Sequence, residues 1–337
     1  MTSVLGLASP RVGRAEGPYE LNIGTLAPKG TPWMAALEQL EREVEAETGG
    51  RINVILRPPG VMGEVEMVRE VRIGDRLQGC TVSAGALAEG GNAPLLSLVE
   101  LPFLFRTDAE VDHVLDDVLF APMSDELAKR GFVLGSWSEN GWRSFATRGA
   151  AVTSPADLQR LRMRSQESPV HVEMYRAFGV APIQKPMTEV LTSLQSGVID
   201  GFDGTALYVA SAGLGDAIDH FTVTRHIYQP SVIVWSARWF DRLPPDLQTV
   251  LRSKRSIGPA TRQALRAEDQ AALDRFEVVG VEVHQLTAAQ RDAFATVARR
   301  IHDPIAAGIE GGPALLAKIR AGIATTPSRS GPASAPP

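Results

Sequence analysis

The chain has 337 residues, of which 44% are hydrophobic and 22% are charged, and its formal net charge is −5. This length is typical of about two domains, and the composition is that of a folded globular protein, which excludes a disordered or coiled-coil chain. The negative net charge excludes the basic surface of a general nucleic-acid-binding protein.

The two ends of the chain differ from the rest in composition. Residues 1–19 contain a short apolar stretch followed by small residues that suit signal-peptidase cleavage, but no positively charged region precedes them. This segment is therefore interpreted either as the remnant of a signal peptide or as a disordered tail. Residues 325–337 are rich in Pro, Ser and Ala and lack large apolar side chains, so we expect a disordered tail there.

Between the ends, apolar patterns predict strands and helices in alternation. The first half should contain strands at 21–26, 52–56, 80–83, 132–137 and 144–147, and helices at 32–48, at 63–75 and from 108 onward. Thr31-Pro32 is typical of a helix start, with threonine as N-cap and proline at the first helical position, and Gly49-Gly50 is typical of a helix end.

The second half repeats this order. Ser154-Pro155 and Ser168-Pro169 predict two more helix starts, followed by helices at 169–179 and 188–196 and strands at 198–202, 227–236 and 281–286. The segment 245–276 predicts one unusually long helix, interrupted only by Gly258-Pro259, and two amphipathic helices should follow residue 286. Alternating strands and helices favour an α/β fold with mainly parallel sheets.

Short catalytic motifs are absent from this sequence: it has no GxSxG, no HExxH and no phosphate-binding GxxxxGK[ST]. None of the six histidines pairs at metal-ligand spacing with Cys, Asp or another His, so we expect no metal site and no cofactor. The single cysteine, Cys80, lies in an apolar strand and is interpreted as an inert buried thiol; alone it cannot form an intrachain disulfide. No run of about 18 apolar residues predicts a membrane-spanning helix.

Two arginines carry the strongest binding signal. Arg143 and Arg164 each lie at the edge of a predicted strand, and Arg164 is followed closely by the helix start at Pro169. A guanidinium can hold a carboxylate with two parallel hydrogen bonds, and a helix N-terminus adds free N–H groups to an anion site. The alternative is that each arginine is exposed or pairs with a structural carboxylate.

Several stretches, taken together in their order and spacing, resemble one known family. They are Thr48-Gly-Gly-Arg-Ile52, Gly60-Val-Met-Gly-Glu64, Leu101-Pro-Phe103, and the run that includes Ser154-Pro-Ala-Asp-Leu158, Leu161-Arg-Met-Arg164, Phe178-Gly-Val-Ala-Pro182, Thr188-Glu-Val190 and Leu194-Gln-Ser-Gly-Val-Ile-Asp-Gly201. Over roughly residues 20 to 300 the chain resembles the solute-binding proteins of tripartite ATP-independent periplasmic (TRAP) transporters, the dicarboxylate-binding-protein-like family.

This resemblance implies a two-lobed periplasmic binding protein of type II-like α/β fold, with a long helix that spans both lobes. We expect lobe 1 to comprise residues 20–140 and 229–268 and lobe 2 residues 141–228 and 269–324, with no sheet shared between residues 20–140 and 150–220. The resemblance also implies export to the periplasm, a carboxylate ligand, and delivery of that ligand to small and large membrane subunits. We expect a monomer that binds no nucleic acid.

The resemblance assigns the carboxylate anchor to Arg164 and places Arg143 in the same pocket. Tryptophans near strand ends and helix starts suggest aromatic walls for a cleft, although core packing explains them equally well. The predicted apolar lining and polar contacts are Trp33, Met62, Trp142, Met187, Phe202 and Tyr208, with Thr25 and Ser83. Where many members have an amide side chain, this chain has Phe202 and Asp203, which favours a bulkier or less polar acid than a sugar acid.

The leading interpretation is therefore a solute-binding protein for an organic acid, without catalytic residues, that works by closing two lobes around its ligand. One alternative is a stand-alone periplasmic sensor or envelope binding protein with the same fold. Another is an enzyme acting in the cleft, which would require a general acid and base there.

Overall fold

A computed structural model describes residues 18–57, 60 and 62–327, so the expectations for residues 1–17 and 328–337 lie outside the described residues. The strands are β1 (Tyr19–Gly24), β2 (Ile52–Arg57), β3 (Gly79–Ser83), β4 (Phe132–Thr147), β5 (Met163–Ser165), β6 (Ile183–Gln184), β7 (Gly201–Thr205), β8 (His220–Ser236) and β9 (Glu282–Gln285). The main helices are α1 (Pro32–Thr48), α2 (Glu64–Ile73), α3 (Ala84–Gly90), α4 (Asp108–His113), α5 (Phe120–Lys129), α6 (Pro155–Leu158), α7 (Pro169–Ala177), α8 (Val190–Gln195), α9 (Ala206–Ser211), α10 (Ala237–Phe240), α11 (Pro245–Ser253), α12 (Ile257–Val278), α13 (Ala288–Ala298), α14 (His302–Ala307) and α15 (Gly312–Ala324).

Helix starts follow the local signals of the sequence. The Thr31 hydroxyl accepts a hydrogen bond from the backbone N–H of Met34, and α1 ends at Gly49, whose φ of 60° is the left-handed conformation that glycine adopts freely. Ser154 forms a capping box with Asp157 at the start of α6. The predicted starts of α1, α6 and α7 are therefore confirmed.

The strands form one hydrogen-bonded path in the order β2-β1-β3-β8-β4-β7-β5-β6, with β9 added to β8. The pairs of the outer strands are parallel, whereas β8 pairs antiparallel with β3 and β4, and β4 pairs antiparallel with β7. The sheet is thus mixed, and the predicted separation of strands 132–137 and 144–147 is wrong. Those residues belong to the 16-residue strand β4, which pairs with β8 from Phe132 to Thr147.

The expectation that residues 20–140 and 150–220 share no sheet is also wrong, because β4 and β8 are long enough to run through both halves of the molecule. The pairing of β4 with β8 shifts register between Glu139 and Gly141 and again between Arg143 and Phe145. Gly141 has a φ of 113°, a conformation that a side chain would strain. Among the described residues, buried apolar side chains form four clusters, and one of them joins Trp33 and Met34 of α1 to Phe202 of β7.

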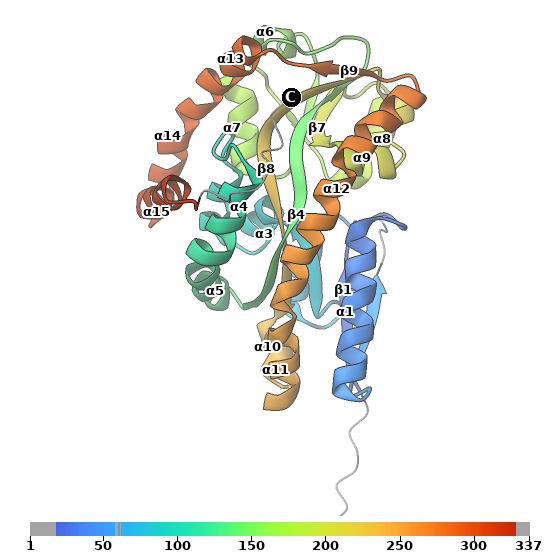
Figure 1. The fold of residues 1–337 in the computed structure, drawn as a ribbon, viewed down its shortest axis with the longest axis vertical. Coiled ribbons are helices and arrows are strands. Elements are labelled where there is room, and N and C mark those ends of the chain that lie inside the picture. The colour runs from blue at the N-terminus through green and yellow to red at the C-terminus, as the bar shows by residue number, and fades with distance from the viewer. Residues whose placement is uncertain (1–17, 58–59, 61, 328–337) are drawn as a thin grey trace, which may run out of the picture.

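The predicted helix 245–276 is two helices, because residues Lys254–Ser256 form a 3₁₀ turn between α11 and α12. Figure 1 shows α12 running along β4 from the half that holds α1 to the half that holds α9, and it contacts all three elements. Gly258 permits the close approach to β4, since a Cβ there would lie 1.9 Å from the carbonyl oxygen of Trp137. Pro259 lies in the first turn of α12, where backbone N–H groups have no partner within the helix. A proline, which lacks this N–H, therefore does not interrupt the helix there.

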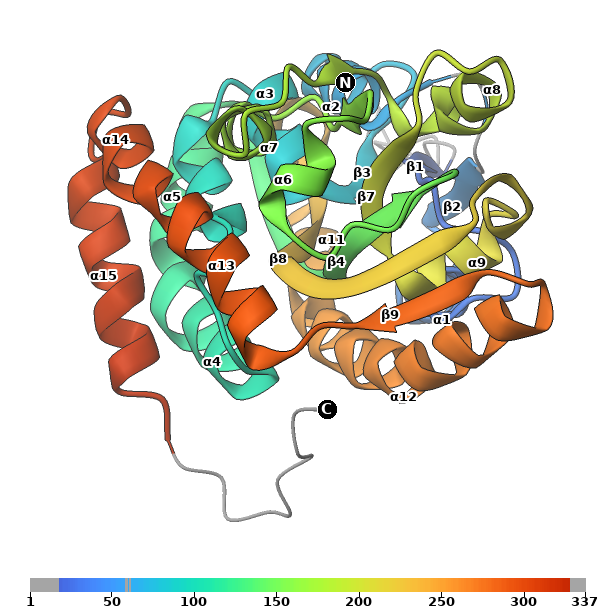
Figure 2. The same cartoon turned by 90° about the horizontal axis from the view of Figure 1, so that it is seen from above.

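Between β9 and residue 327, where the description of the C-terminal part ends, there are three α-helices, α13, α14 and α15, where two were predicted. Figure 2 shows them along one side of the molecule, where α13 packs against α7 and β8. α15 packs against α4 and against the π-helical turn Val114–Leu119 that follows it. Within the described part of the chain, none of the helices combines the length and the apolar character needed to cross a membrane.

Candidate ligand-binding site

A cavity lies where the carboxyl ends of β1, β5 and β7 meet the middle of β4 and β8, the position at which open α/β sheets bind ligands. It holds about 630 Å³ of space, its open mouth included. The lining comes from both lobes and comprises Thr25, Leu26, Ala27, Trp33, Glu64, Thr81, Asn140, Arg143, Arg164, Gln166, Met187, Gly204, Thr205, Tyr208, Gln229 and Ser231.

Arg164 is a buried cation of this cavity that has no ion-pair partner among the described residues. It is 2% exposed, and its Nε donates a 2.7 Å hydrogen bond to the backbone carbonyl of Lys185. Its Nη1 is buried and finds no hydrogen-bond partner among the described residues. Burial, and next the positive charge of Arg143, lower the pKa of Arg164 to about 10. An anion placed at Nη1 would offset the free-energy cost of burying this positive charge.

Arg143, by contrast, is neutralised within the protein. Its guanidinium pairs with the carboxylate and the backbone carbonyl of Asp203. Asp203 lies on β7, which pairs antiparallel with β4, the strand of Arg143. The Tyr175 hydroxyl donates to the same carboxylate at 3.0 Å, and ring nitrogens of His171 and His226 lie 3.6 Å from it. Burial alone would raise the pKa of Asp203, but the Arg143 charge and the hydrogen bonds of His171 and His226 hold it well below its ordinary value.

A chain of hydrogen bonds links the two lobes along the cavity wall. The Glu64 carboxylate accepts from the Ser83 backbone N–H at 2.7 Å and hydroxyl at 2.9 Å, and Gln166 Nε2 donates to the Ser83 hydroxyl at 3.1 Å. Gln229 then donates to Gln166 Oε1 and accepts from Arg143 Nη1, both at 2.7 Å. Burial is the main cause that raises the pKa of Glu64. These hydrogen bonds join Glu64, Ser83, Gln166, Gln229 and Arg143 in one network.

The apolar wall is formed by aromatic rings and one methionine. Trp33 donates from Nε1 to the Glu139 carbonyl at 2.6 Å, and its ring meets the Tyr208 ring edge-on with centroids 6.3 Å apart. Met187 lies beside them in the short 3₁₀ turn Met187–Glu189. The bond between Trp33 and Glu139 ties α1 to β4, so the aromatic wall is fixed at the point where β4 shifts register.

The structure brings six of the predicted site residues together around the cavity: Thr25, Trp33, Arg143, Arg164, Met187 and Tyr208. The other four, Met62, Ser83, Trp142 and Phe202, are absent from the lining, which is a correction to the predicted pocket.

Each of the four has a physical reason to lie elsewhere. Successive side chains of a strand point to opposite faces, so Trp142 faces away from Arg143 and donates to Asp108. Phe202 is fully buried in a hydrophobic cluster that also includes Trp33, and Met62 packs against another cluster. Ser83 lies behind Glu64 and Gln166.

Sequence reasoning missed most of the polar lining, including Asn140, Gln166, Thr205, Gln229 and Ser231. Gln166 directly follows β5, two residues after Arg164, so the end of the predicted strand at the binding arginine is the signal that could have found it. With Phe202 and Asp203 buried outside the cavity, the argument for a less polar ligand is lost.

Comparison with known proteins identifies the architecture. The family model described as bacterial extracellular solute-binding protein, family 7, matches residues 23–308. The chain belongs to this family. A "Solute-binding protein" from Verminephrobacter eiseniae is 30% identical over 80% of this chain and 79% of its own length. The 2,3-diketo-L-gulonate-binding periplasmic protein of Escherichia coli is 30% identical over 74% of this chain and 76% of its own length.

A solved structure agrees with this assignment. The TRAP periplasmic solute-binding protein from Polaromonas sp. JS666, bound to D-erythronate, is 25% identical and superimposes with a TM-score of 0.83 over 90% of this chain and 98% of that one. The expected resemblance and the two-lobed α/β fold are confirmed. The family and this structural relative are binding proteins, which favours binding over catalysis in the cavity.

Proposed function

We propose that this protein is an exported, periplasmic solute-binding protein of a TRAP-type transporter that captures an organic acid between its two lobes. The observation that carries the proposal is the buried guanidinium of Arg164, which belongs to the cavity lining and whose Nη1 has no hydrogen-bond partner among the described residues. The two oxygens of a carboxylate can accept two parallel hydrogen bonds from a planar guanidinium, which favours a carboxylate as the ligand.

The lining also supports a choice of ligand class. Hydroxyl, amide and carboxylate side chains outnumber the apolar ones, and those of Thr25, Asn140, Gln166 and Thr205 line the same cavity as the two arginines. Such groups suit hydroxyls along a carbon chain, so a hydroxylated monocarboxylic acid is the proposed ligand. Relatives that bind D-erythronate and 2,3-diketo-L-gulonate carry ligands of this class.

We further propose that the lobes divide near residues 140 and 229, where β4 and β8 pass the cavity, and that they close around the ligand as a hinge. Closure would create the surface that small and large membrane subunits recognise. A stand-alone sensor would share the ligand but not these partners. Uptake of a labelled acid by cells that carry the membrane subunits, with and without this protein, separates the two functions.

Calorimetry with matched ligands tests the binding proposal. D-Erythronate and 2,3-diketo-L-gulonate should bind, whereas erythritol, which lacks the carboxylate, should not. Arg164→Ala should weaken binding by about two to three orders of magnitude, because a lost partner of a buried charge pair costs about 3–5 kcal/mol.

Arg162→Ala is the matched control. Arg162 is a neighbouring arginine, but its side chain is 58% exposed and pairs with Asp200 at the surface, so its loss should change affinity little. Equal binding of erythritol and D-erythronate, or equal losses in the two variants, would contradict the proposal. If neither acid binds, native mass spectrometry of protein purified from its producing cells should reveal a carboxylate; a co-purified ligand without one would also contradict it.

A further inference from the structure

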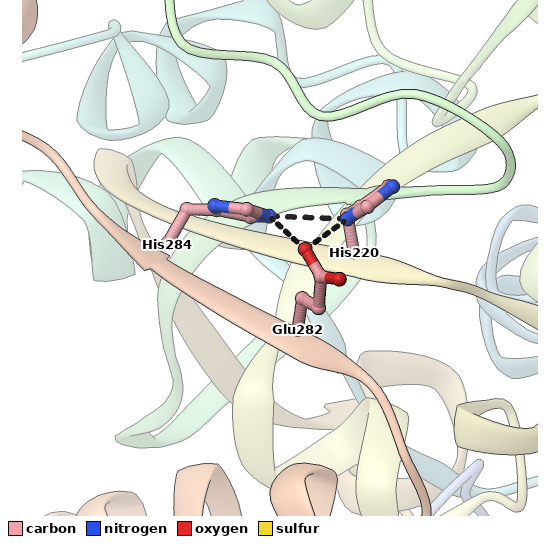
Figure 3. Close-up of side chains that lie close together, drawn as sticks. All are labelled: His220, Glu282 and His284. Atoms are coloured by element: carbon pink, nitrogen blue, oxygen red, sulfur yellow. Dashed lines mark hydrogen bonds and ion pairs between the residues drawn. The ribbon is translucent and has the colours of Figure 1, made fainter.

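A cluster of three ligand-type side chains lies outside the cavity, where β9 joins β8. The two strands are parallel, with His220 opposite Glu282 and Thr222 opposite His284. Alternate residues of a strand share a face, so Glu282 and His284 point to the same side, and His220 faces them from β8. Figure 3 shows the three side chains converging above the sheet.

The spacing of the donor atoms is that of a coordination sphere. His220 Nδ1 lies 3.1 Å from His284 Nε2 and 3.5 Å from Glu282 Oε2, and His284 Nε2 lies 3.7 Å from the same oxygen. The point equidistant from these three atoms lies about 2.0 Å from each of them, which is the length of zinc–nitrogen and zinc–oxygen bonds. An ion could therefore bind all three without a rearrangement of the backbone.

We propose that His220, Glu282 and His284 bind one divalent transition-metal ion of the zinc class, with a fourth position open to water. Two imidazoles and one carboxylate suit Zn²⁺, Ni²⁺ or Cu²⁺, whereas Mg²⁺ and Ca²⁺ prefer oxygen ligands throughout. The side chains of His220 and His284 are 17% and 27% exposed and that of Glu282 is 69% exposed, so the site opens to solvent on the carboxylate side.

This site is separate from the organic-acid cavity. His220 pairs with Thr147 of β4, which lies four residues along that strand from Arg143, a distance of about 13 Å at 3.3 Å per residue. None of the three ligand residues lines the cavity. Metal binding is therefore independent of whether the acid-binding proposal holds.

The consequence is a cross-link between distant segments of the chain. β9 follows α12, and its pairing with β8 spans only residues 220–223 and 282–285. An ion held by residues of both strands binds the folded protein but not the unfolded one, so it should raise the midpoint of thermal unfolding.

The test uses the full chain without a histidine tag, freed of metal by a chelator. Titration with ZnCl₂ in a calorimeter should give one ion per chain. At a Zn²⁺ concentration about 100-fold above the dissociation constant the unfolding midpoint should rise by about 4 °C, and a chelator should reverse the rise. With Co²⁺, the visible absorption of a four- or five-coordinate ion with nitrogen ligands should appear.

Variants assign the site. His284→Ala and Glu282→Gln should each weaken Zn²⁺ binding at least tenfold and remove the cobalt absorption. His113→Ala is the control, because His113 also contacts a carboxylate, that of Asp117 at 2.9 Å, but belongs to no group of three potential ligands among the described residues. Circular dichroism verifies folding, and Glu282 is exposed enough for its variant to fold. Absence of Zn²⁺ binding, or binding unchanged in both variants, would overturn the proposal.

Discussion

Replacing Arg164 with methionine should stabilise the ligand-free protein while abolishing its binding of acids. Burial lowers the pKa of this guanidinium from 12.5 to about 10, so the folded state disfavours the charged form, which costs about 3 kcal/mol at neutral pH. The substitution also removes the hydrogen bond to the Lys185 carbonyl, which is worth about 1 kcal/mol. The net expectation is a gain of about 2 kcal/mol in the free energy of unfolding.

Arg143→Met is the contrasting variant, because it makes the same change of side chain at the other arginine of the cavity. It leaves the buried carboxylate of Asp203 without its main partner, which should cost about 3–5 kcal/mol. Chemical denaturation of the ligand-free proteins measures both changes. Stabilisation of Arg164→Met together with destabilisation of Arg143→Met is the expected pattern. If both variants lose similar stability, the division of roles between the two arginines is wrong.

The remaining predictions concern buried groups elsewhere. Burial raises the pKa of the Glu139 carboxyl from 4.5 to about 7, so between these pH values the folded state holds a proton that the unfolded state has lost. The free energy of unfolding therefore falls as pH rises from 4.5 to 7. In Glu139→Gln, denaturation curves across this pH range should show a fall that is smaller by up to about 3 kcal/mol. Gly258→Ala should cost about 1–3 kcal/mol or more in thermal unfolding, because its Cβ meets the Trp137 carbonyl; an unchanged midpoint would contradict the packing of α12 on β4. Asp203→Asn should destabilise the fold by about 3–5 kcal/mol in urea denaturation, since Arg143 then lacks a counter-charge, and a neutral effect would argue against the buried pair.

Much of the fold could be predicted from the sequence because its signals are local. The N-cap at Thr31 and the capping box at Ser154 are satisfied by atoms within three residues, so they act wherever the helix packs. Apolar alternation placed β1, β2 and β3 within a few residues of their observed bounds. Bounds that depend on tertiary pairing were missed: residues 138–143 continue β4 only because β8 supplies hydrogen-bond partners on that side.

The sequence by itself determined the family, the alternation of strands and helices, and the choice of Arg143 and Arg164 as the arginines at the cavity. Only the tertiary structure decided how these two differ. Asp203 lies 60 residues from Arg143 and neutralises it, whereas Arg164 has no carboxylate partner in the part of the chain that the structure describes. His220 and His284, 64 residues apart, likewise meet only through the pairing of β8 with β9. Local patterns encode backbone conformation and burial, but the partner of a buried charge is set by which distant segment packs against it, and no spacing along the chain records that contact.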